Sequence, residues 1–98
     1  MATTRRNEMP SIFGKVVALE NAYRELRFGV QSKENCFAVR EIAAKTIRAI
    51  KEDRDRIYTT GPKVHGRFEA SQLDLLSKWQ GEAEAVFDNC ERMAAKAA

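Results

Sequence analysis

His65 is the side chain in this sequence best suited to moving protons near neutral pH, and it is the only histidine. Imidazole catalysis generally depends on a second group that orients the ring or exchanges a proton with it. Lys63 and Arg67 flank His65 at alternate positions, but no second catalytic group stands near it in the sequence. The chain also has no glycine-rich phosphate loop and no nucleophile elbow. We therefore predict that it has no catalytic residues, binds no cofactor and is not an enzyme.

Cys36 and Cys90 are the other reactive side chains. A structural zinc site needs about four ligands, and His65 is remote in sequence from both cysteines, so we expect no bound metal. Each cysteine falls on the apolar stripe of a different expected helix, where a free thiol packs as a small hydrophobic group. A disulfide would need an oxidising compartment, which nothing in the sequence indicates. We predict that both thiols are buried and reduced.

The composition is typical of one small domain outside the membrane. The chain has 98 residues, of which 44% are hydrophobic and 32% charged, and no apolar run approaches the ~20 residues that span a bilayer. Arg5 and Arg6 are followed by polar residues and Pro10, so the N-terminus is unlike a secretory signal. We expect a flexible tail over residues 1–8, a single helical domain over residues 9–98 and a cytoplasmic location.

Apolar residues recur at helical spacing in three stretches, approximately 11–28, 32–59 and 69–96. Pro10 and Ser11 indicate the first helix start, and Gly29 is typical of a left-handed residue that closes a helix. The short link between the first two stretches predicts an antiparallel hairpin. The fold class is therefore all-α: a three-helix bundle in which a helical hairpin packs against a long C-terminal helix, with dimerisation into a larger bundle as an open alternative.

Two further signals set the expected start of the third helix. Gly61 and Pro62 break the second stretch, and residues 59–68 are expected to form a loop. Ser71 followed by Asp74 resembles a capping box, so the third helix is expected to begin near residues 69–71.

The third stretch carries an unbroken seam with alternating spacings of three and four residues. Its members are Leu76, Trp79, Ala83, Val86, Cys90, Met93 and Ala97. Such a seam is most often the protein's own core, but it could exceed what two companion helices can cover. Tryptophan, methionine and phenylalanine are enriched at the centres of protein interfaces. The candidate partner-binding residues are Trp79, Phe87, Leu75 and Met93.

A basic set of residues offers a second class of function. In an extended segment, Lys63, His65 and Arg67 would point to one side. Together with the N-terminal arginines they form a possible anion or nucleic-acid contact, which consists of Arg5, Arg6, Lys63, His65 and Arg67. The formal net charge is only +3, whereas tracking phosphates requires concentrated positive charge.

The pattern as a whole favours a small non-enzymatic protein–protein interaction module. It would act as a homodimeric adaptor, or as a small inhibitor or antagonist that binds a larger bacterial or phage-host protein. The alternative is a weak nucleic-acid-binding accessory protein that uses the basic tail and the 61–67 loop. The expected partner is another protein or a second copy of the chain, and no membrane is involved.

Overall fold

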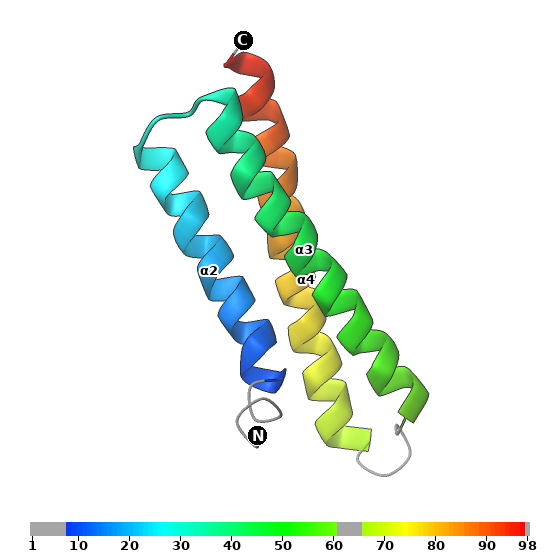
Figure 1. Ribbon diagram of the computed structural model, residues 1–98. Coiled ribbons are helices and arrows are strands. Elements are labelled where there is room, and N and C mark those ends of the chain that lie inside the picture. The colour runs from blue at the N-terminus through cyan, green and yellow to red at the C-terminus, as the bar shows by residue number, and fades with distance from the viewer. Residues whose placement is uncertain (1–7, 61–65, 98) are drawn as a thin grey trace.

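The described part of the chain folds into three long helices. The computed structural model of the chain describes the backbone of residues 8–60 and 66–97, and the side chains of 12–57 and 72–97. The helices are α2 (Glu8–Phe28), α3 (Lys33–Thr60) and α4 (Gly66–Lys96), and the described ranges contain no strand. α3 runs antiparallel to both α2 and α4 (Figure 1). The predicted all-α three-helix bundle is confirmed.

α2 begins at Glu8, three residues before the predicted start at Ser11. The sequence pattern assigns Pro10 to the segment that precedes the helix. Proline is tolerated in the first turn of a helix, because the first four backbone N–H groups have no partner within the helix and its missing N–H is not needed there. Pro10 is therefore part of α2. Residues 1–7 of the expected tail lie outside the described residues.

α4 begins at Gly66, so the predicted start near residues 69–71 is wrong, and Ser71 lies inside the helix. Arg67, Glu69 and Ala70 all have side chains that favour helices, which allows α4 to extend upstream of the expected cap. The capping-box pattern is statistical and does not by itself end a helix. One consequence is that Arg67 is helical, so the expected extended alternation of Lys63, His65 and Arg67 does not hold for Arg67.

The connection between α2 and α3 is closed by side-chain hydrogen bonds. The Asn35 backbone N–H donates to Ser32 Oγ over 3.0 Å, so Ser32 is the N-cap of α3. Asn35 Nδ2 also donates to the Val30 carbonyl over 2.9 Å. The left-handed conformation predicted for Gly29 is wrong, because no described glycine has a positive φ. Gly29 is instead required by space, since a Cβ there would lie 2.8 Å from the Glu25 carbonyl oxygen.

Two glycine substitutions are expected to have opposite effects on stability. Gly29→Ala is expected to lower the free energy of unfolding by about 1 kcal/mol, because the added methyl meets backbone that must shift. Gly81→Ala is expected to raise it by up to about 1 kcal/mol, because Gly81 lies inside α4 and a Cβ there meets no atom within 4 Å. Urea denaturation followed by circular dichroism measures both. A loss of stability in Gly81→Ala would contradict the open space around it.

The core divides into two clusters along the bundle. Both include residues from all three helices. The larger cluster consists of Leu19, Leu26, Cys36, Val39, Ala43, Ala83, Val86, Cys90 and Ala94. The smaller consists of Ile12, Val16, Ile50 and Leu76. Most of the predicted α4 seam is therefore core. The one buried polar side chain among the described residues, Thr46, satisfies its hydroxyl by donating to the Ile42 carbonyl over 2.8 Å.

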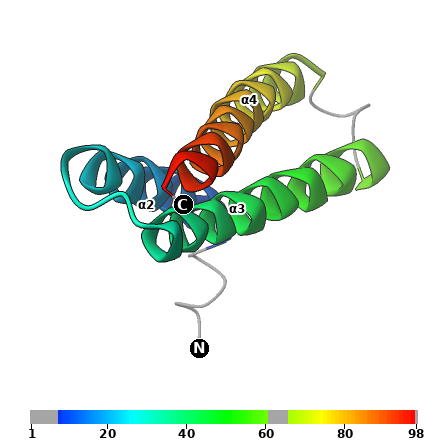
Figure 2. The same ribbon diagram turned by 90° about the horizontal axis from the view of Figure 1, so that it is seen from above.

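Packing among the three helices is uneven. α3 and α4 make the most extensive contact, α2 packs mainly on α3, and α2 touches α4 only sparsely. α2 therefore lies to one side of the α3–α4 pair (Figure 2). With 21 residues against 28 and 31, α2 is also the shortest helix. Two surfaces stay exposed as a result. One lies where α2 approaches α4, and the other is the face of the α3–α4 pair opposite α2.

Candidate functional site

An exposed apolar surface lies where α2 approaches α4. It consists of Phe13, Leu75 and Trp79, here called the aromatic patch. The rings of Phe13 and Trp79 are tilted by 46° with their centroids 5.9 Å apart, a favourable arrangement for an aromatic pair. Phe13 remains 57% exposed and Leu75 44% exposed, while Trp79 is half-buried. Large apolar side chains are thus presented to solvent beside the only tryptophan of the chain.

Helix geometry explains why these side chains are exposed. Ile12 and Leu76 are buried in the smaller core cluster. Phe13 follows Ile12 in the sequence, and Leu75 precedes Leu76. Because successive residues point about 100° apart around a helix, Phe13 and Leu75 lie at the margin of the core. Because α2 and α4 make few contacts, nothing in the described chain covers these margins.

A small pocket with a volume of about 80 Å³ opens beside the aromatic patch. Residues from all three helices line it: Ile12, Asp53, Ile57, Gln72, Leu75, Leu76 and Trp79. Most of the lining is apolar. The Asp53 carboxylate is largely buried and forms a 2.8 Å ion pair with Arg56 on the same helix. The pocket therefore combines an apolar interior with two polar groups, the Asp53 carboxylate and the Gln72 amide, that can orient a ligand.

A second hollow lies between α3 and α4. It is an open groove of about 440 Å³ lined by Ala44, Ile47, Arg48, Lys51, Glu84 and Phe87. Above it, the Arg40 guanidinium lies over two rings, 4.6 Å from the centroid of Phe37 and 5.5 Å from that of Phe87. Arg40 also forms a 2.9 Å ion pair with Glu91 of α4. These contacts hold Phe37 and Phe87 in place next to the groove.

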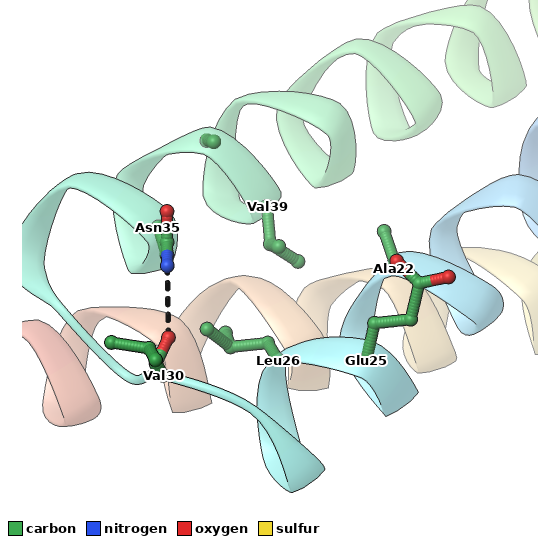
Figure 3. Close-up of a pocket in the computed structure, with 7 residues that line it drawn as sticks. Ala22, Glu25, Leu26, Val30, Asn35 and Val39 are labelled. Carbon is green, nitrogen blue, oxygen red and sulfur yellow. Dashed lines mark hydrogen bonds between the residues drawn. The ribbon is translucent and has the colours of Figure 1, made fainter.

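A third hollow lies between α2 and α3 near their connection (Figure 3). It has a volume of about 340 Å³ and is lined by Ala22, Glu25, Leu26, Val30, Asn35, Ala38 and Val39. Leu26 and Val39 belong to the core cluster. Asn35 is already engaged with the Val30 carbonyl, as the dashed line in Figure 3 shows. The remaining lining is small or solvated, so this hollow has no large apolar anchor and no free polar group that converges on its centre.

The four predicted partner-binding residues lie in three different places. Leu75 and Trp79 come together in the aromatic patch. Phe87 lies on another side of α4, at the α3–α4 groove. Met93 is half-buried and packs against the larger core cluster. The structure thus assembles two of the four residues into one surface and separates the other two from it.

Three exposed aromatic residues, Phe13, Phe28 and Phe37, were not among the predicted binding residues, and Phe13 and Phe37 lie at the surfaces described above. The sequence places Phe13 beside the apolar stripe of α2 and Phe37 at the edge of that of α3, and the two side chains are 57% and 42% exposed. α2 carries apolar side chains around most of its circumference, so its sequence gives little indication of which face is buried. The clue that was present is the size of Phe13, since a large ring next to Ile12 exceeds what one stripe can bury.

The predicted anion contact cannot be assembled from the described residues. Arg5, Arg6, Lys63 and His65 lie outside them, and the Arg67 side chain is also outside, although its backbone belongs to α4. Within the described part of the chain, no three His, Cys, Asp or Glu side chains are grouped as metal ligands. In the same part, no helix has an apolar stretch long enough to cross a bilayer.

Both cysteines are buried and carry free thiols, as predicted. The pKa of Cys90 is raised from 9.0 to about 11, chiefly by burial of the thiol; the nearby Cys36 adds to the rise and Arg40 opposes it. A raised thiol pKa means little thiolate at neutral pH, and the thiolate is the nucleophilic form. Cys90 is therefore a packing residue and not an activated nucleophile.

This pKa makes stability depend on pH in alkaline solution. The folded state holds the Cys90 proton up to about pH 11, whereas the unfolded chain releases it near pH 9.0. The contribution to folding is complete below pH 9 and is lost between pH 9 and 11, at about 1.4 kcal/mol per pH unit. Denaturant midpoints measured across this range should fall faster for the native sequence than for Cys90→Ala. Equal slopes for the two proteins would contradict the assignment.

Comparison with protein-family models, curated proteins and solved structures found no match for this chain. Function must therefore be inferred from the geometry of the aromatic patch and the grooves.

Proposed function

We propose that this protein is a non-enzymatic interaction module, and that the aromatic patch binds an apolar surface of another protein. The observation that carries the proposal is the exposure of Phe13 and Leu75 beside Trp79. Contiguous exposed apolar surface on a small protein is typical of binding sites. The module would act in the cytoplasm as an adaptor or as a small antagonist of a larger protein, and its two free thiols are consistent with a reducing compartment.

The residue types of the patch suit a binding anchor. Covering exposed apolar area yields roughly 25 cal/mol per Å², and aromatic residues dominate the energetics of many interfaces because they are large and rigid. Trp79 is already held by Phe13, so little side-chain freedom would be lost when a partner covers it. The patch therefore presents a preorganised apolar anchor.

The pocket beside the patch can supply specificity. Its apolar lining from Ile12, Ile57 and Leu76 accommodates an apolar side chain of the partner, while Asp53 and Gln72 accept or donate hydrogen bonds at its margin. Asp53 already has Arg56 as a partner, but a protein that lacked a matching polar group would leave the Gln72 amide unpaired on binding, which is costly. We thus expect the partner to present one apolar side chain next to at least one hydrogen-bonding group.

Site-specific photo-crosslinking in the cells that naturally contain the protein tests the proposal. A photoreactive phenylalanine is placed at Phe13, where an exposed aromatic ring already stands, and in a separate variant at Ala85, which is exposed on α4. Position 13 is expected to form a protease-sensitive, nuclease-resistant adduct of defined mass. Position 85 should not form it. The same adducts at both positions, or none at position 13, would contradict binding by the aromatic patch.

A further inference from the structure

The α3–α4 groove has walls of opposite charge. Its apolar floor is formed by Ala44, Ile47 and Phe87. Arg48 and Lys51 stand on the α3 side, and Glu84 stands on the α4 side. The groove lies away from the aromatic patch. It is therefore a separate surface, and its occupant is independent of the proposed function of the patch.

We propose that this groove receives a second copy of the chain, with each α3 lying against the partner's α4 around a two-fold axis parallel to the helices. The α3–α4 pairs of the two copies then form a four-helix arrangement, which is the usual way in which paired antiparallel helices cover one another. The interface is self-complementary, as a two-fold contact requires.

The heights of the charges along the helices select this arrangement. Arg48, Lys51 and Glu84 line one groove and so lie at one level, and Arg40 and Glu91 are joined at another by their 2.9 Å ion pair. A two-fold axis parallel to the helices preserves these levels and sets basic α3 against the partner's acidic α4. An axis perpendicular to the helices would instead set α3 against α3, with basic side chains facing each other, which is unfavourable.

The charges on the α3 wall have no partner of their own in the described structure. Among residues 12–57 and 72–97, no carboxylate lies within ion-pair distance of Arg48 or Lys51. Glu84 accepts a 2.9 Å hydrogen bond from Gln80, which in turn accepts one from Arg54 of α3. Docking of a second copy sets the Glu84 carboxylate on α4 of one copy opposite the two α3 cations of the other, and it covers the exposed ring of Phe37.

Charge reversal on the two walls tests this interface. Lys51→Glu and Glu84→Lys are made separately, and the dissociation constant of the dimer is measured by sedimentation equilibrium from micromolar to millimolar concentration. Each variant alone places like charges together twice in its homodimer, so its dissociation constant should rise about tenfold. In an equimolar mixture the heterodimer has two attractive contacts, and association should return close to that of the native chain.

The controls separate the interface from the fold. Lys45→Glu, an exposed reversal elsewhere on α3, should leave the dissociation constant unchanged, and circular dichroism should show equal helicity for all variants. A native chain that is monomeric at every concentration would overturn the proposal. So would a dimer that is indifferent to both reversals, or a mixture that associates no better than the single variants. None of these results depends on whether the aromatic patch binds another protein.

Discussion

Leu19→Ala is expected to lower the free energy of unfolding by about 3 kcal/mol. Leu19 is 2% exposed and belongs to the core cluster that joins all three helices. Its truncation removes apolar contact and leaves a cavity that rigid neighbours on α3 and α4 fill only in part. Small domains have total stabilities of about 5–15 kcal/mol, so one such change removes a large share. Urea denaturation followed by circular dichroism measures the loss.

Phe28→Ala is the matched control, because it removes a larger apolar side chain from an exposed site. Phe28 is 81% exposed at the end of α2, and the Arg27 guanidinium lies 5.8 Å from the centroid of its ring. The change in free energy of unfolding should stay within about 0.5 kcal/mol. If Phe28→Ala cost as much as Leu19→Ala, the position of the core between the helices would be wrong.

Leu75→Asp is expected to weaken partner binding about 30-fold or more while the protein stays folded. Leu75 contributes to both the aromatic patch and the pocket beside it, and 44% of its surface is exposed. Binding would force the new carboxylate into an apolar contact without a counter-ion, close to the Asp53 carboxylate. A loss of this size corresponds to that of an interface hot spot. The measurement is the yield of the adduct formed by the photoreactive residue at position 13, compared with and without Leu75→Asp over a series of expression levels.

Val30→Asp gives a matched control for that experiment. Val30 is 72% exposed in the connection between α2 and α3, and its substitution introduces the same change from apolar to charged away from the patch. Capture by this variant should equal that of the native chain. Equal losses in Leu75→Asp and Val30→Asp would indicate a general effect of charge and would argue against a local binding surface.

The number of helices and the buried residues of α4 could be predicted from apolar spacing alone. Leu76, Ala83 and Cys90 recur at intervals of seven residues and are all buried, because positions two turns apart face the same way on a helix. The short link capped by Ser32 was equally readable, since a cap acts within a few residues of the chain. These features depend on local geometry, which the order of residues determines directly.

The helix starts and the binding surface were harder to predict. Pro10 is compatible both with ending a segment and with the first turn of a helix, and its type cannot distinguish the two. The aromatic patch unites Phe13 with Trp79 across two helices that make few contacts. Which margin of the core stays open depends on how far α2 covers α4. The extent of this coverage is set by how the helices pack, and the apolar periodicity of a single helix does not indicate it.

The emission of Trp79 tests binding by the aromatic patch most directly, because it is the only tryptophan and lies within the patch. The native protein is titrated with the protein captured at position 13. A blue shift that saturates with binding and persists at about 0.5 M salt is predicted, because an apolar contact removes water from the indole and is little screened by ions. Complete binding with unchanged emission would show that the partner docks elsewhere and would contradict the proposed role of the patch.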